Sequence, residues 1–129
     1  MSWLKKIFAR REKRMPTSIS DENFEELVLR SEIPVIVDVW SAGCGPCVKL
    51  ESVMVELATR FGDQLRVCEM NVAGAPRACA GLNIRATPTV VYFAKGLEIE
   101  RVRGFRSSLY HAEAIAELFG INDRDVGDH

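Results

Sequence analysis

The sequence predicts an α/β fold in which a central mixed β-sheet carries helices on both faces. Residues 35–40 and 65–72 form two runs of mainly β-branched and other apolar residues, typical of strands covered on both sides. Strand 89–93, a turn at Lys95-Gly96 and strand 98–103 then predict a hairpin. Strands joined through helices are parallel, because such crossovers are right-handed, whereas the closing hairpin is antiparallel. Helices then cover both sides of the sheet.

The helices are predicted from apolar spacing and from end signals. A first helix begins after a cap at Ser20 and fades near Ser31. The next starts after the turn at residues 43–46 and ends at Gly62, with apolar residues on one face (Leu50, Val53, Met54, Leu57, Ala58 and Phe61). A short helix covers 75–82, and a last one, capped by Ser107 or Ser108, runs to Phe119. The expected order is helix, strand, helix, strand, helix, strand, strand, helix.

Length and composition indicate one globular domain. The chain has 129 residues, of which 47% are hydrophobic and 27% charged, and this length can bury a core without disulfide staples. No apolar run is long enough to span a membrane, and we find no secretory signal, so we expect a cytoplasmic protein.

Residues 1–16 form a basic amphipathic arm, ahead of a domain at 17–120 and a flexible tail at 121–129. The arm holds six basic residues against Glu12 alone, although the chain as a whole has net charge −1. On a helix, its apolar residues (Trp3, Leu4, Ile7 and Phe8) share one face. Peripheral contact of residues 1–14 with an anionic membrane is one interpretation, and a disordered solubilising or partner-binding tail is the other. Nucleic acid is disfavoured, because the acidic body would repel phosphate.

Cys44-Gly45-Pro46-Cys47 lies where a strand ends and a helix begins. The positive end of a helix dipole and its unpaired N–H groups stabilise a thiolate, which is the reactive form of cysteine. Cys47 is close enough in sequence to form a disulfide with Cys44. The expected chemistry is therefore dithiol–disulfide exchange, with Cys44 attacking and Cys47 resolving the mixed disulfide.

The alternative for this motif is half of a zinc or iron–sulfur site. Such a site needs further ligands at motif spacing, whereas the other cysteines are eleven residues apart and the only histidines are His111 and His129. We therefore expect no metal. Cys68, in a buried strand, is expected to be inert, and Cys79 is either a buried thiol or a second redox site.

Two segments resemble the thioredoxin family. Residues 37–47 (Val-Asp-Val-Trp-Ser-Ala-Gly-Cys-Gly-Pro-Cys) are similar to its active-site segment, and 84–89 (Ile-Arg-Ala-Thr-Pro-Thr) to its cis-proline loop. Gly96 and Gly104 fall where the family has glycines, and the resemblance covers about 17–120. It implies the thioredoxin fold.

The resemblance also implies roles for individual residues. Asp38 would be a buried carboxyl of raised pKa that exchanges the proton of Cys47. Pro88 would be cis, with the Thr87 backbone pairing to an extended substrate. Trp40 would pack beside the site. The alternatives are that Asp38 is a capped strand residue and Trp40 only part of the core. The expected substrate-binding set is Trp40, Gly43, Gly45, Pro46, Thr87, Pro88 and Gly104.

The sequence departs from the family at three positions. Gly43 replaces the usual Trp before the first cysteine, which changes partner choice. Glu69 stands where the family has a lysine near the aspartate, so that two carboxyls share one proton and Asp38 is harder to ionise. Ser52 replaces the proline that kinks the active-site helix, so this helix is expected to be straighter.

The resemblance implies a thioredoxin-like protein-disulfide reductase that needs no bound cofactor. Its partners would be protein disulfide substrates and a thioredoxin-reductase-like flavoenzyme, and we expect a monomer. The alternative is a redox-weak binding module that uses the thioredoxin fold to hold a partner and is recruited by its N-terminal arm.

Overall fold

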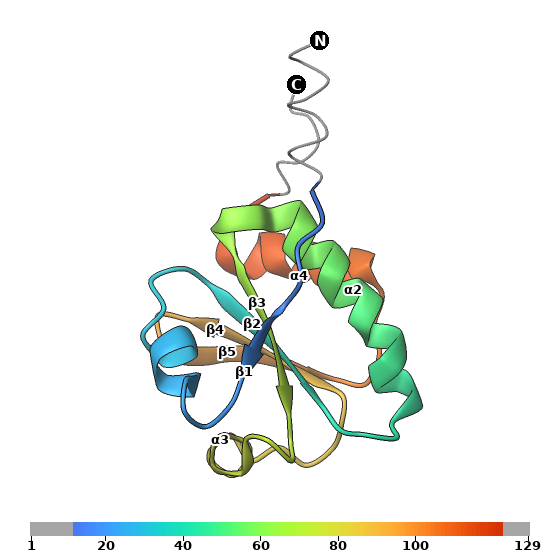
Figure 1. Cartoon of the computed structure of the whole chain (residues 1–129). Helices are drawn as coiled ribbons and strands as arrows, with labels where there is room; N and C mark the ends of the chain where they lie inside the picture. The colour runs from blue at the N-terminus through green and yellow to red at the C-terminus, as the bar shows by residue number, and fades with distance from the viewer. Residues whose placement is uncertain (1–11, 123–129) are drawn as a thin grey trace.

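The computed structural model describes residues 12–122 and confirms the predicted α/β sandwich (Figure 1). Five strands form one mixed sheet in the order β1-β3-β2-β4-β5. The strands β1, β2 and β3 are parallel to one another, whereas β4 runs antiparallel to both β2 and β5. Their bounds are β1 Thr17–Ile19, β2 Val35–Trp40, β3 Arg66–Asn71, β4 Thr89–Ala94 and β5 Leu97–Arg103.

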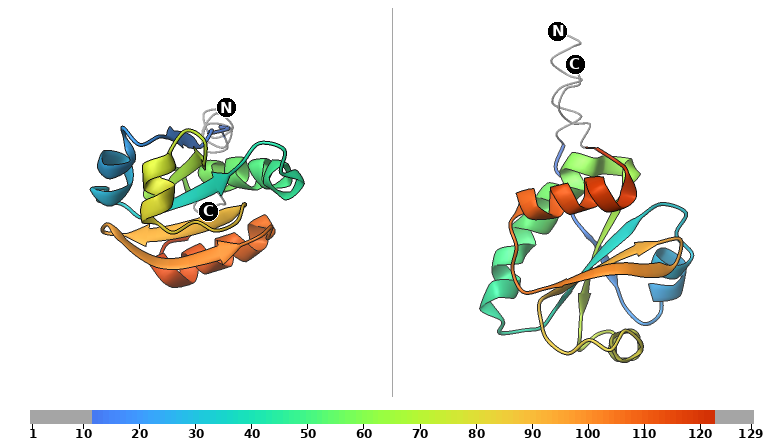
Figure 2. Two further views of the ribbon diagram at one scale, coloured as in Figure 1. Left: turned by 90° about the horizontal axis from the view of Figure 1, so that it is seen from below. Right: turned by 180° about the vertical axis from the view of Figure 1, so that it is seen from behind.

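Helices cover both faces of this sheet (Figure 2). One face packs against α2 (Gly45–Phe61) and α4 (Ser108–Phe119), and the short 3₁₀ turn η2 (Gly62–Gln64) follows α2. The other face packs against η1 (Glu25–Leu29) and α3 (Pro76–Gly81). The α4 cap is Ser107, whose Oγ accepts a hydrogen bond from the Tyr110 N–H.

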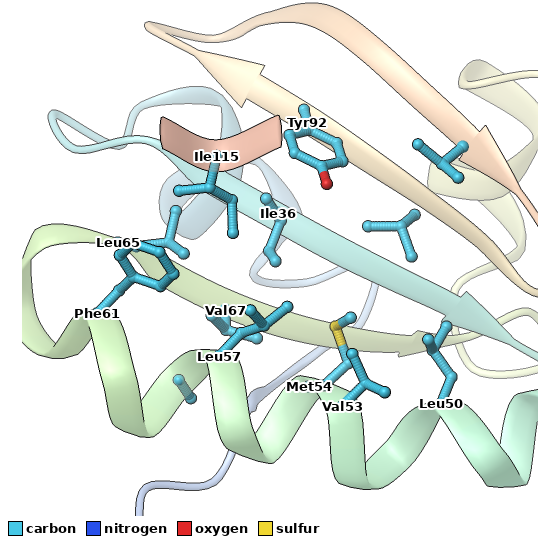
Figure 3. Packing of buried hydrophobic residues seen from close by; sticks show 13 residues of the cluster. Ile36, Leu50, Val53, Met54, Leu57, Phe61, Leu65, Val67, Tyr92 and Ile115 are labelled. Atoms are coloured by element: carbon cyan, nitrogen blue, oxygen red, sulfur yellow. The ribbon is translucent and has the colours of Figure 1, made fainter. Parts of the chain in front are cut away.

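Alternation along the strands divides the core into two clusters. Ile36 and Tyr92 face α2 and α4, whereas Val37 and Val91 face η1 and α3. Figure 3 shows the first cluster, in which apolar residues of α2 reach across to the sheet and to Ile115 of α4. Each large side chain buried in this way contributes about 1.5–3 kcal/mol to folding. Burial on both faces explains why β2 and β4 are almost continuously apolar.

The N-terminal part differs from the prediction. The structure adds β1, which pairs with β3 over three residues and buries only Ile19. The predicted helix after Ser20 is a turn followed by one short π-helical segment, η1. The Ser20 Oγ accepts a hydrogen bond from Glu22 N–H, so the serine stabilises the turn rather than a long helix.

Most of the predicted arm and tail, 1–11 and 123–129, lies outside the described residues. Residues 12–16 have no regular structure, and Arg14 attaches them to the domain. Its backbone N–H donates to Thr59 Oγ1 at 3.0 Å, and its guanidinium pairs with Asp63 at 2.9 Å. Across residues 12–122, no helix combines the length and apolar character needed to cross a membrane.

Candidate functional site

Cys44 and Cys47 form a disulfide at the junction between β2 and α2. The strand ends at Trp40, a turn follows, and Cys44 is the N-cap residue of α2, with Pro46 in the first turn of the helix. Their Cα atoms are 5.2 Å apart, within the range that a disulfide needs. Gly43 adopts φ +76°, a conformation that side-chain-bearing residues rarely take, which favours glycine in this turn.

The two sulfurs differ in exposure and in their contacts. Cys44 is partly exposed, whereas Cys47 is 3% exposed. The Cys44 Sγ accepts a hydrogen bond from the Cys47 N–H at 3.2 Å, one of the N–H groups that a helix start leaves without a partner. This N–H and the positive end of the α2 dipole stabilise negative charge on Cys44. Cys44 is therefore the sulfur that a partner can reach and that forms the thiolate more easily.

The loop before β4 lies against this pair. Its Thr87–Pro88 peptide bond is cis, as the resemblance implies. Thr87 O is 3.7 Å from Cys44 Sγ, and the Thr87 hydroxyl shares a hydrogen bond of 2.6 Å with that of Ser41. Pro88 O accepts a hydrogen bond of 2.8 Å from the Gly104 N–H. The active-site turn, the cis-proline loop and the segment after β5 thus meet at one end of the sheet (Figures 1 and 2).

Asp38 lies inside the domain, on β2. It is 2% exposed, and its Oδ1 has no hydrogen-bond partner among the described residues. Burial, together with the negative charges of Glu69 and Glu51, raises the pKa of Asp38 to about 7, and burial is the largest cause. A carboxyl group with a pKa near neutrality can both accept and donate a proton in the physiological range.

A cavity of about 450 Å³ opens beside Asp38. Glu51 and Glu69 also line it, and Met15 and Pro16 border it from the N-terminal side. Glu69 is the parallel-ladder partner of Asp38 on β3, so the two side chains point to the same face of the sheet. The placement of Glu69 beside Asp38 agrees with the prediction.

A family model for thioredoxin matches residues 15–117. The chain belongs to the thioredoxin family. It is 38% identical over 86 residues to the M-type chloroplastic thioredoxin of Spinacia oleracea (67% of this chain, 48% of that protein) and 36% identical over 87 residues to thioredoxin 1 of Synechococcus elongatus (67% and 81%). A thioredoxin of Acidithiobacillus ferridurans is 39% identical over 85 residues (65% and 79%). The match therefore spans about half the length of the spinach relative.

Thioredoxins are protein-disulfide oxidoreductases, and this thioredoxin domain carries a disulfide-bonded cysteine pair, Cys44 and Cys47. The relatives are named thioredoxins, which favours the oxidoreductase over the binding module. Thioredoxins act on disulfides in other proteins, which is the substrate class that the sequence predicts.

The structure brings most of the predicted site residues of this thioredoxin together. Cys44, Cys47, Gly43, Gly45 and Pro46 form the turn and the start of α2, with Thr87, Pro88 and Gly104 beside them. Trp40 is half-buried at the end of β2, and its indole N–H donates to Glu69 Oε1 at 2.6 Å. Trp40 and Asp38 line the cavity behind the turn rather than the exposed face.

Two contacts at the site were not expected from the sequence. The first is the Ser41–Thr87 hydroxyl pair, and the second is the Trp40–Glu69 hydrogen bond. Each joins residues far apart in the chain, so local patterns carry no signal for them. The sequence predicts Glu69 near Asp38, but the hydrogen bond between Glu69 and the Trp40 indole depends on the β2–β3 register.

The remaining cysteines are free and buried. Burial raises the pKa of Cys68 to about 12, which agrees with the expectation of an inert thiol. Burial also raises the pKa of Cys79, and the nearby Asp21 raises it further. A raised pKa lowers the thiolate fraction, which disfavours Cys79 as a second redox site.

Proposed function

We propose that this thioredoxin reduces disulfides in other proteins by cycling Cys44 and Cys47 between dithiol and disulfide. The observation that carries the proposal is the position of Cys44: partly exposed, at the N-terminus of α2, bonded to a buried Cys47 and next to cis-Pro88. This arrangement joins an activated nucleophile to a resolving thiol and a peptide-binding edge.

In the first step, the Cys44 thiolate attacks one sulfur of the substrate disulfide. The substrate S–S bond breaks, a mixed disulfide between Cys44 and the substrate forms, and the leaving sulfur takes up a proton. The Cys47 N–H and the α2 dipole stabilise the thiolate before attack.

In the second step, Cys47 gives its proton to the Asp38 carboxylate and attacks Cys44 Sγ. The mixed disulfide breaks, the Cys44–Cys47 disulfide forms, and the substrate leaves with its second sulfur as a thiol. The pKa of about 7 suits Asp38 to this exchange. Overall, the cysteine pair gives two electrons to the substrate and releases two protons, one from Cys44 when its thiolate forms and one from Cys47 to Asp38, while the two substrate sulfurs take up two protons.

Substrate binding falls to the three loops around the sulfurs. The Thr87 backbone, whose carbonyl oxygen is 3.7 Å from Cys44 Sγ, would pair with an extended substrate segment, and cis-Pro88 would pack beside it. The turn residues and the Gly104 segment would form the rest of the surface, and Trp40 would pack beside it. The proposed substrate-binding residues are Trp40, Gly43, Gly45, Pro46, Thr87, Pro88 and Gly104.

The reductant of the cycle would be a thioredoxin-reductase-like flavoenzyme, which supplies the two electrons that restore the dithiol. We further propose that the protein acts as a monomer in the cytoplasm, and that residues 1–14 attach it to anionic membrane. The described chain begins and ends at the end of the domain opposite the junction between β2 and α2, which carries the disulfide (Figure 1). An attachment through the arm would therefore leave the cysteines accessible.

Insulin reduction with dithiothreitol tests the disulfide-reductase proposal. Wild-type protein should accelerate insulin precipitation, and Cys44→Ser should return it to the uncatalysed rate. Cys68→Ser is the matched control, because it removes a buried thiol outside the site and should keep the activity. A Cys44→Ser variant as active as wild type would refute the proposal and leave the binding module.

Liposome co-sedimentation tests the arm. Protein with residues 1–14 should sediment with vesicles rich in phosphatidylserine but not with neutral vesicles, since each basic residue near such a surface contributes about 1 kcal/mol. Equal sedimentation of the full chain and of a form that begins at residue 15 would exclude the arm as an anchor.

A further inference from the structure

From the charges around the disulfide, we infer that this thioredoxin selects substrate disulfides flanked by acidic side chains. The inference rests on the proposed function and names its substrate class. It concerns one surface, the basic rim, defined here by the exposed residues Arg85, Arg103 and Arg106.

The basic rim lies on the two loops that meet beside the disulfide. Arg85 is two residues before Thr87, whose carbonyl oxygen is 3.7 Å from Cys44 Sγ. Arg103 is the ladder partner of Thr89 and precedes Gly104, which donates its N–H to Pro88 O. Arg106 Nη1 lies beside Gly104, 3.7 Å from the position that a Cβ would occupy there. The rim therefore belongs to the same two loops that form the peptide-binding edge.

The loop segments beside the disulfide have one sign of charge, whereas the carboxyl groups of Asp38, Glu51 and Glu69 line the cavity behind the turn. No Asp or Glu occurs in residues 39–49, 83–89 and 103–108, although the net charge of the chain is −1. The same segments contain four basic residues, which are Lys49, Arg85, Arg103 and Arg106. Among residues 12–122, no carboxylate forms an ion pair with any member of the basic rim. Glu98 is paired with Arg101, although the charge of Arg103 also lowers the pKa of Glu98. The rim side chains lie outside these ion pairs, and their charges can act on a partner.

The loop after β5 also offers an apolar contact and a fixed cation. Phe105 is 39% exposed, directly after Gly104. The Arg106 guanidinium lies 5.6 Å from the centroid of the Tyr110 ring and donates to Phe105 O at 2.9 Å, which restricts its position. An aromatic anchor next to oriented cations is the usual composition of a small recognition surface. Phe105 supplies the exposed aromatic ring that the turn lacks at Gly43.

These features favour an acidic protein segment over other anionic partners. The cysteines and the Thr87 backbone require a disulfide within an extended peptide, and the rim lies within reach of side chains on that same segment. Opposite charges raise the encounter rate and discriminate against wrong partners more than they raise affinity. The expected discrimination therefore appears in the rate of reduction.

The test compares three disulfide-linked peptide dimers of equal length, in which glutamate, glutamine or lysine flanks the cysteine. Reduced full-length protein should reduce them in the order glutamate, glutamine, lysine at low ionic strength, with a span of about tenfold in second-order rate constant. The span should close near 1 M salt, where the screening length falls to about 3 Å. Equal rate constants for the three peptides at low salt would overturn the basic-rim inference and leave the disulfide-reductase proposal intact.

Matched double variants locate the effect. Arg85→Gln with Arg103→Gln should abolish most of the preference for the glutamate peptide over the glutamine peptide. Arg30→Gln with Lys95→Gln removes the same charge at the far end of the sheet, next to η1 and the β4–β5 turn, and should keep the preference. An equal loss of the glutamate preference in both double variants would show that the net charge of the protein, not the basic rim, causes the selectivity. A wild-type protein that reduces none of the peptides would instead refute the proposed function.

Discussion

Asp38 is a carboxyl group that the fold separates from water and leaves with one oxygen unpaired. Its pKa rises from an ordinary 3.8 to about 7. Between these values the folded protein binds more protons than the unfolded chain, so stability falls as the pH rises from about 4 to about 7. The stability that comes from holding Asp38 in its protonated form is fully present below pH 4 and is lost above pH 7.

Replacing Asp38 by asparagine should remove this pH dependence. Since one pKa unit corresponds to about 1.4 kcal/mol, Asp38→Asn should be more stable than wild type by a few kcal/mol at pH 8. The gain should be smallest near pH 4, where the wild-type carboxyl is protonated. Urea unfolding at both pH values measures it, and a gain of the same size at both would contradict a buried, protonated Asp38.

Glu69 raises the pKa of Asp38 more than Glu51 does. Glu69→Gln should therefore lower the pH midpoint of the second, Cys47-dependent step, and Glu51→Gln should lower it less. The amide oxygen of glutamine can still accept the Trp40 N–H, so the packing of the indole is retained. Single-turnover kinetics with a pre-formed mixed disulfide gives the midpoint. An unchanged pH midpoint in Glu69→Gln would exclude an effect of the Glu69 charge on the pKa of Asp38.

At the scale of single residues, the sequence identifies the groups but not their partners. The Cys44–Cys47 spacing, the buried strand around Asp38 and the Thr-Pro-Thr segment all point to the site before any fold is known. The Trp40–Glu69 and Ser41–Thr87 hydrogen bonds join residues 29 and 46 positions apart. Such contacts depend on strand register and loop packing, which local patterns do not specify.

Among the elements, α4 and β4 are joined by a buried polar pair. The Tyr92 hydroxyl shares a hydrogen bond of 2.5 Å with His111 Nδ1, and both residues are 0% exposed. Burial and, to a smaller extent, the positive charge of Arg106 lower the pKa of His111 to about 4, so the imidazole is neutral at physiological pH. The pair therefore attaches α4 to the sheet without a buried charge.

Removing the hydroxyl should weaken this attachment. Tyr92→Phe leaves His111 Nδ1 without its partner and should lower the free energy of unfolding by about 1–3 kcal/mol. Tyr110→Phe is the control, because Tyr110 is 43% exposed and its change should have little effect. Chemical denaturation at pH 7 compares them, and equal stabilities of the two variants would count against the pair.

The predicted helices and strands agree best with the structure where apolar residues recur over several positions. For α2, β2 and β4, periodicity or continuous apolar runs predict both the type and the approximate ends. The strand β1 is too short to show alternation, and it exists because the edge of β3 offers backbone partners. The η1 segment has helical spacing, but the turn formed by Ser20 and the chain's return to β2 leave it only five residues long.

On the scale of the whole molecule, the domain separates its functions between two ends. The junction between β2 and α2, which carries the disulfide, and the loop before β4 lie at one end of the sheet, and the described chain begins and ends at the other (Figure 1). The fold class is predictable from the sequence because helices alternate with buried strands and a hairpin closes the sheet. The surface charge around the disulfide is not, because the segments that carry Arg85, Arg103 and Arg106 are brought to the Cys44 end of the sheet by the contacts of Thr87 with Cys44 and of Pro88 with Gly104.

The account depends on Cys44 being the attacking sulfur and Cys47 the resolving one. Trapping with insulin tests this most directly: each single serine variant, reduced and mixed with insulin, is quenched with acid and analysed by mass spectrometry. Cys47→Ser should accumulate a mixed disulfide through Cys44, because the attacking thiolate is present and the resolving thiol is missing. Cys44→Ser should accumulate almost none, since the buried Cys47 cannot reach the substrate. The reverse pattern, or equal trapping by both variants, would contradict the assignment.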